Sequence, residues 1–141
     1  MNWLFFAFSA AFGFGLYHFF TKLSADKFNP ALASAIIGAA SFVAAALAVV
    51  FLKLSGQPIT FPKNYLYLPI AAGLFAGIAE IFYLMMFAKN TPISIGNPLI
   101  VAGTTLIAVV LGLIFLKEPL NATKIFGILL TAAGLIFLLR G

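Results

Sequence analysis

The chain has 141 residues, of which 64% are hydrophobic and only 8% are charged, and its net charge at pH 7 is +5. A soluble domain is about 45–50% apolar and about 25% charged, and a domain of this size leaves a large share of its surface in water. This composition excludes a soluble enzyme and a disordered chain, and it predicts a protein whose main solvent is lipid.

The charged and metal-binding residue types are too few and too dispersed for several kinds of site. The eight Lys and Arg residues lie singly at the ends of apolar runs, which is typical of membrane proteins and unlike a basic patch for nucleic acid. The chain has no cysteine, one histidine and three acidic residues. We therefore expect no nucleic-acid partner, no metal site, no cofactor and no nucleophile–base pair of an enzyme.

Five apolar runs are long enough to cross the hydrocarbon layer of a membrane, which takes about 20 residues in a helix. The runs are residues 3–20, 31–54, 65–88, 97–116 and 122–139. We therefore predict an all-α integral membrane protein that forms a single domain of five transmembrane helices over residues 1–141. The first run is not expected to be a cleaved signal peptide, because no Lys or Arg precedes it.

The breaks between the runs contain residues that start and end helices. Asn29 is expected to cap the second helix, with Pro30 in its first turn. The connection from Lys117 to Asn121 is short, which predicts that the last two helices are antiparallel neighbours. The fourth helix is expected to open at Gly96-Asn97-Pro98, where Asn97 and polar backbone groups can face a ligand.

The positive charges do not select an orientation in the membrane. With five spans, Lys53, Lys63, Lys117 and Lys124 would lie on the N-terminal side, and Lys22, Lys27, Lys89 and Arg140 on the other. Orientation follows an excess of Lys and Arg in cytoplasmic loops, and four against four leaves no excess. Either one cation or the free amino terminus decides the orientation, or copies insert both ways up, as half of a protein built from inverted repeats would require.

Glu80 is an acid within a predicted span, where a carboxylate costs at least about 2.5–3.5 kcal/mol. At 100° per residue it shares an arc with small residues, including Gly73 and Gly77, whose spacing lets another backbone approach. We expect Glu80 to face the protein interior or a cavity and to favour its protonated form, because desolvation penalises charge. It would exchange a proton or a cationic substrate there. The alternative is a structural hydrogen bond to a neighbouring helix.

Three further residues are candidates for the same site. His18 lies in the last turns of the first predicted helix, at a depth about 5 Å from that of Glu80. A pair between the two is one interpretation, and a histidine near the interface, bonded to water or headgroups, is the other and the one we favour. Tyr17 and Tyr83 lie deeper than the tyrosines at helix starts. Their rings can line a cavity and hold a cation or a planar ligand, or they can simply face lipid.

The last third of the chain carries a distinctive pattern. One helix ends in Leu116-Lys117-Glu118, a short turn follows, and the next helix carries Gly127 and Gly134 in GILLTAAGLIFLL. Together with the five spans and the chain length, this pattern resembles a single EamA domain of the drug/metabolite transporter superfamily. Thr105 stands where many members have a proline, and the deep acid is Glu80 rather than a glutamate in the first helix, as in the related small multidrug resistance proteins. The two glycines are expected to serve in helix packing, as are Gly73 and Gly77.

The resemblance implies a secondary transporter of a small organic solute, working by alternating access, with Glu80 as the site of a proton or a cationic group. Larger members contain two such domains in inverted orientation, so it also implies an inverted homodimer with dual topology. The first, third and fourth helices would line its central cavity, in the inner membrane of a prokaryote. Membrane lipid and a small-molecule substrate are then the other partners. A scaffold subunit that packs helices in a membrane complex and a lipid-handling flippase remain as alternatives.

Overall fold

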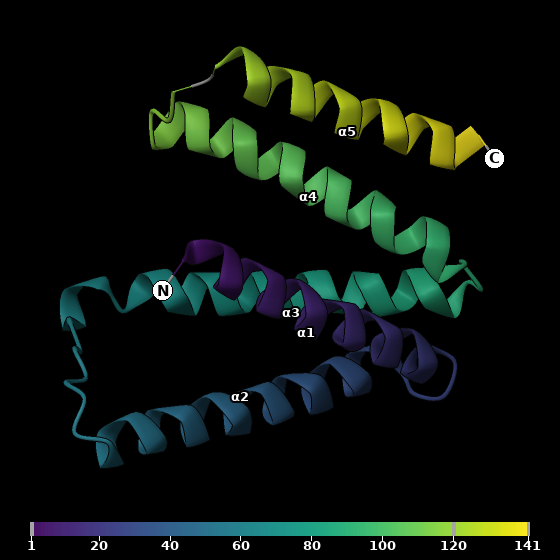
Figure 1. Cartoon of the computed structure of the whole chain (residues 1–141). Helices are drawn as coiled ribbons and strands as arrows, with labels where there is room; N and C mark the ends of the chain where they lie inside the picture. The colour runs from purple at the N-terminus through teal and green to yellow at the C-terminus, as the bar shows by residue number, and fades with distance from the viewer. Residues whose placement is uncertain (1, 120, 141) are drawn as a thin grey trace. The chain divides into compact units, whose positions relative to one another are not determined.

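The computed structural model describes residues 2–119 and 121–140, and the regular structure in this part of the chain is entirely helical (Figure 1). The α-helices are α1 (Trp3–Ala25), α2 (Pro30–Leu54), α3 (Tyr67–Ala88), α4 (Ile93–Phe115) and α5 (Ala122–Arg140), and a short 3-10 helix, η1 (Lys63–Tyr65), precedes α3. The first four are long and apolar enough to cross a membrane. The all-helical class is thus confirmed, and four of the five predicted spans have the length and composition that crossing a membrane requires. The fifth, α5, is confirmed as an apolar helix, and its passage through the membrane stays a prediction.

Three predicted helix boundaries were wrong. α1 continues past residue 20 to Ala25, because the polar residues that follow residue 20 include no proline or glycine that would end a helix. α3 starts at Tyr67 rather than residue 65, after the separate turn of η1. α4 starts at Ile93 rather than residue 97, so that Pro98 lies inside the helix. Pro98, the sixth residue of the helix, has no amide hydrogen for the carbonyl four residues before it, and membrane helices tolerate such a proline where neighbouring groups satisfy the freed carbonyl.

The ends of α2 show how local sequence sets the helix limits. The Asn29 side chain accepts a hydrogen bond from the Ala31 amide at 3.0 Å, with Pro30 as the first helical residue, so the predicted cap is confirmed. At the other end Gly56 adopts a φ of 71°, which glycine reaches without steric cost. The Gln57 amide then bonds the Leu52 carbonyl at 3.1 Å, and this Schellman motif ends the helix.

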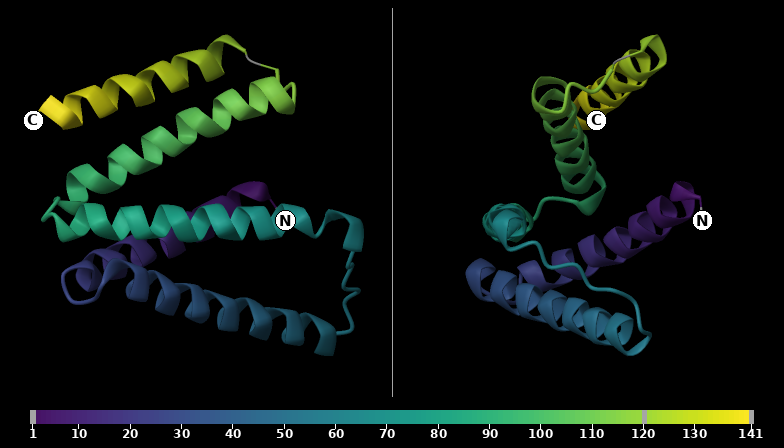
Figure 2. Two further views of the ribbon diagram at one scale, coloured as in Figure 1. Left: turned by 180° about the vertical axis from the view of Figure 1, so that it is seen from behind. Right: turned by 90° about the vertical axis from the view of Figure 1, so that its left-hand side faces the viewer.

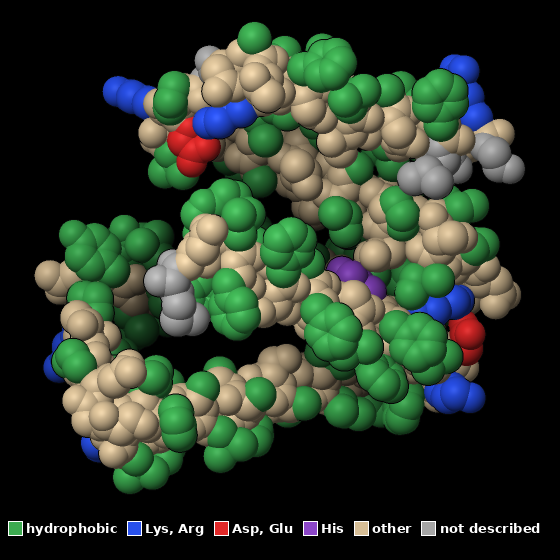
Figure 3. Space-filling view, viewed as in Figure 1, with side chains coloured by type: hydrophobic (Ala, Val, Ile, Leu, Met, Phe, Trp, Pro, Cys, Tyr) green, Lys and Arg blue, Asp and Glu red, His purple; other side chains and the backbone are tan. Residues whose placement is uncertain are grey.

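The first compact unit, Met1–Asn90, contains α1, α2 and α3. Its buried residues gather where the C-terminal ends of α1 and α3 meet the start of α2; they are Thr21, Ala25, Ala33, Tyr83, Leu84 and Phe87. Toward its N-terminus, α1 leads away from α3 (Figure 2, right). Most large hydrophobic side chains of these helices are exposed, as Figure 3 also shows on one face, which suits contact with lipid.

The second compact unit, Thr91–Gly141, contains α4 and α5. The two helices run antiparallel side by side, as the short connection predicted (Figures 1 and 2). After α4, Lys117 takes a left-handed conformation with a φ of 54°, and the Glu118 amide donates to the Gly112 carbonyl at 3.2 Å. The Asn121 side chain accepts from the Lys124 amide at 2.8 Å and so caps α5.

Candidate functional site

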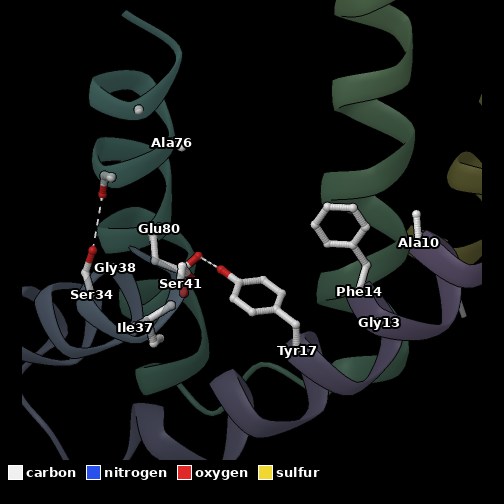
Figure 4. Close-up of a pocket in the computed structure, with 12 residues that line it drawn as sticks. Ala10, Gly13, Phe14, Tyr17, Ser34, Ile37, Gly38, Ser41, Ala76 and Glu80 are labelled. Atoms are coloured by element: carbon white, nitrogen blue, oxygen red, sulfur yellow. Dashed lines mark hydrogen bonds between the residues drawn. The ribbon is translucent and has the colours of Figure 1, made fainter. Parts of the chain in front are cut away.

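A cavity of about 670 Å³ lies between α1, α2 and α3 of the first unit (Figure 4). Each helix contributes four residues to the wall, spaced i, i+3, i+4 and i+7; they are Ala10, Gly13, Phe14 and Tyr17 of α1, Ser34, Ile37, Gly38 and Ser41 of α2, and Gly73, Ala76, Gly77 and Glu80 of α3. Residues at this spacing share one face of a helix. Each of the three helices therefore turns one face toward the cavity.

Glu80 is the only acidic or basic side chain among the lining residues. Its side chain is half-buried, and the Tyr17 hydroxyl reaches across from α1 to donate a hydrogen bond to Oε2 (Figure 4). The other oxygen, Oε1, is buried and has no hydrogen-bond partner among the described residues. A carboxylate accepts hydrogen bonds on both oxygens, so Oε1 is available to a proton or to a donor from a ligand.

His18 and Tyr83 form a second link between α1 and α3, beside the cavity. The Tyr83 hydroxyl and His18 Nδ1 are hydrogen-bonded at 2.8 Å, and the two rings lie 5.2 Å apart. Phe14 stacks on the imidazole from the cavity side, with ring centroids 6.3 Å apart and an interplanar angle of 25°. The imidazole is thus held among three aromatic rings, those of Phe14, Tyr17 and Tyr83.

Lys22 extends this seam of contacts toward the C-terminal end of α3. Its Nζ donates to the Phe87 carbonyl at 3.2 Å and lies 5.3 Å from the centroid of the Phe87 ring. A cation near the last carbonyls of a helix is favourable because of the helix dipole. The side-chain hydrogen bonds described between α1 and α3 therefore join residues 17–22 with residues 80–87.

The structure brings together four of the five residues predicted for the binding site. Glu80 and Tyr17 lie in the cavity wall, while His18 and Tyr83 lie beside it. Glu80 is hydrogen-bonded to Tyr17 and His18 to Tyr83. These two bonds between α1 and α3 take the place of the direct pair considered for Glu80 and His18. Asn97 lies half-buried near the start of α4, in the second unit. The functional roles of all five remain predictions.

The glycines predicted for helix packing have open space around them in the described part of the chain. A Cβ placed on Gly73, Gly77, Gly127 or Gly134 would meet no atom within 4 Å. Gly73 and Gly77 instead leave room in the cavity wall. Packing of these positions against another copy of the chain stays a prediction.

Sequence reasoning missed the contribution of α2 to the cavity. Ser34, Gly38 and Ser41 are the small and polar members of its lining face. The Ser34 hydroxyl donates to the Gly77 carbonyl at 3.4 Å and ties α2 to α3. Two serines at i and i+7, with a glycine between them at i+4, stand out in an otherwise apolar helix, and this spacing could have identified the face.

We predict that Tyr17→Phe weakens the first unit because it leaves both carboxyl oxygens of Glu80 without a protein donor. A hydrogen bond to a charged group contributes about 1.5–3 kcal/mol and one between neutral groups about 1 kcal/mol. The loss in unfolding free energy in detergent should therefore be larger at alkaline pH, where the carboxyl is ionised, than at acid pH. Tyr65→Phe, at an exposed position, is the matched control. Equal losses for the two variants would contradict the assignment.

Long apolar helices around a cavity with a single carboxyl define a helical membrane protein with an internal polar site. Residues 1–140 match the family model described as the EamA-like transporter family. The chain therefore belongs to the EamA-like transporter family, and the resemblance found in its last third extends over nearly the whole chain. No curated protein and no solved structure matches the chain.

Family membership settles the broad class of the protein. The chain is an integral membrane protein, a transporter of the drug/metabolite type. Members of the family are transporters rather than enzymes.

Proposed function

We propose that the protein moves a small organic solute across the membrane by alternating access, coupled to protons through Glu80. The observation that carries the proposal is the Glu80 carboxyl in the cavity wall, with Oε1 buried and without a partner among the described residues. An ionisable group within a membrane span is costly and is by default a functional candidate. A group that binds a proton and a solute in turn would link the movement of the two.

The seam between α1 and α3 supports a cavity that opens at one end at a time. Lipid is as apolar as the side chains it surrounds, so helices in a membrane are held together by packing and hydrogen bonds rather than by the hydrophobic effect. The links from Tyr17, His18 and Lys22 are few and local. Their exchange for contacts at the opposite end of the helices would change which side of the membrane the cavity faces.

The functional unit in this proposal is an inverted homodimer of dual topology. A single domain corresponds to half of the two-domain members, and the balanced count of Lys and Arg gives copies no reason to insert one way only. The protein would then act in the inner membrane of a prokaryote. Of the alternatives, the scaffold would use the small residues of α3 as an interface with a partner and Glu80 as a structural hydrogen bond. The Oε1 atom of Glu80, which has no partner among the described residues, favours transport.

The test is transport by the full-length protein in liposomes. Radiolabelled amines, amino acids, sugars and nucleosides are offered in counterflow, and the active solute is then offered with an imposed pH gradient. We expect protein-dependent counterflow of one solute class and its acceleration by the gradient. Counterflow that ignores the gradient would overturn the coupling alone, and no counterflow of any class, with movement of labelled lipid instead, would replace the transporter of solutes by the flippase.

A further inference from the structure

The charge of the cavity wall restricts the ligands that the cavity can hold. Glu80 is its single acidic or basic residue. The two nearest nitrogen-bearing side chains of α1 are engaged outside the cavity wall, since Lys22 bonds the Phe87 carbonyl and His18 bonds Tyr83. A phosphate or carboxylate on the ligand would therefore be desolvated without a counter-charge, which is strongly unfavourable.

When the Glu80 carboxyl is ionised, its hydrogen bonding leaves room for a donor from the ligand. Oε2 already accepts from Tyr17, and Oε1 is buried without a partner in the described structure. The Ser34 hydroxyl donates its hydrogen bond to the Gly77 carbonyl. An ammonium group that carries at least one N–H supplies both the missing donor and the charge that balances an ionised carboxylate. The hydroxyl oxygen of Ser41, in the same wall, can accept a second N–H (Figure 4).

The remainder of the wall suits an apolar body. Phe14, Tyr17 and Ile37 provide the large apolar surfaces, and the other positions around Glu80 are alanines, glycines and the two serines of α2. The edge-to-face pair of Phe14 and Tyr17, with ring centroids 6.3 Å apart, presents aromatic surface to a cation or a ring. A cavity of about 670 Å³ falls in the range of pockets for small organic ligands.

We propose that the substrate is a primary or secondary amine with an apolar body and no anionic group, bound through an ammonium N–H to Oε1 of Glu80. The inference rests on the proposed transport function and specifies its substrate class. It excludes two neighbouring classes. Quaternary ammonium ions carry the same charge but have no N–H for Oε1, and zwitterionic amino acids bring a carboxylate for which the wall has no partner.

Four probes that share one phenyl group and one two-carbon chain separate these possibilities. They are 2-phenylethylamine, 2-phenylethanol, trimethyl(2-phenylethyl)ammonium and phenylalanine. Binding to the full-length protein in detergent is measured by calorimetry. We expect the amine to bind at least about tenfold more tightly than each of the other three. The alcohol and the quaternary ion cannot form the charge-assisted N–H bond, and phenylalanine has to bury a carboxylate without a counter-charge. Equal binding of the alcohol, the quaternary ion or phenylalanine, or no binding of the amine at millimolar concentration, would overturn the proposal.

Variants locate the effect at one carboxyl. Glu80→Gln should remove the preference for the amine, Glu80→Asp should retain it in weaker form, and Glu118→Gln, the same change outside the cavity, should leave it intact. If Glu80→Gln does not fold, Glu80→Asp and Glu118→Gln still decide the question. Loss of the preference in Glu118→Gln would overturn the assignment. A different result would contradict the proposed function: an amine that binds the protein but shows no counterflow in liposomes. Counterflow of neutral solutes only would contradict the substrate class and leave the transport function standing.

Discussion

Glu80→Gln is expected to reduce transport driven by a pH gradient to the level of liposomes without protein. Glutamine has nearly the shape of glutamate and can still accept the hydrogen bond from Tyr17 through its amide oxygen. It cannot bind and release a proton, so the link between proton and solute is lost. Because a neutral amide is cheaper than a carboxylate inside the membrane, the unfolding free energy of the variant should be unchanged or higher.

This combination of outcomes separates the functional role of Glu80 from a structural one. If the Glu80 carboxyl only joined α1 to α3, its removal would lower the stability of the fold. Transport would then fall in proportion to the amount of folded protein. Measuring transport per folded molecule, with Glu118→Gln as the matched control, distinguishes the two. Full gradient-driven transport by folded Glu80→Gln would exclude proton coupling through this residue.

Single lysine substitutions should convert a mixed population of orientations into a uniform one. Lys27→Gln leaves four cations on the N-terminal side against three, and Lys63→Gln leaves three against four. Because the side with more Lys and Arg stays in the cytoplasm, the first variant should place its N-terminus in the cytoplasm and the second outside. Both lysines are exposed and lie outside the α-helices, so neither change should affect folding.

The chain has no cysteine, so one cysteine added at either end reports its side of the membrane to an impermeant thiol reagent. We expect partial labelling of the unsubstituted chain from both sides. Each lysine variant alone should lack transport, and their co-expression should restore it. Uniform labelling of the unsubstituted chain, or transport by one variant alone, would rule out the inverted homodimer.

The sequence was sufficient for the helical architecture because each helix in lipid is specified locally. Runs of apolar residues and a cap such as Asn29 determine where helices form, and these signals do not depend on distant contacts. The two larger errors arose where residues typical of loops were taken as the end of a helix. Lys22 belongs to α1, and Pro98 lies within α4. Polarity indicates where a chain leaves the lipid, which need not be where its helix ends.

The site was only partly predictable because it depends on how faces of different helices meet. The cost of a carboxylate in a membrane identified Glu80, and the arc of small residues placed it correctly in a cavity wall. Its partner could not be chosen in the same way, because Tyr17 and His18 are adjacent on α1 and both lie near the depth of Glu80. Rotation of α1 about its axis decides that the tyrosine reaches Glu80 and the histidine reaches Tyr83. That rotation is a tertiary property.

The glycines of the cavity wall lower the stability of their helices but increase the volume of the cavity. A glycine inside a helix costs about 1 kcal/mol relative to alanine, and a methyl group at Gly13, Gly38, Gly73 or Gly77 would meet no described atom within 4 Å. Replacing any of these glycines with alanine would therefore stabilise its helix, but the added methyl group would reduce the space for a ligand. In evolution, such a wall permits the accepted size of the solute to shift by single methyl increments without displacing a helix.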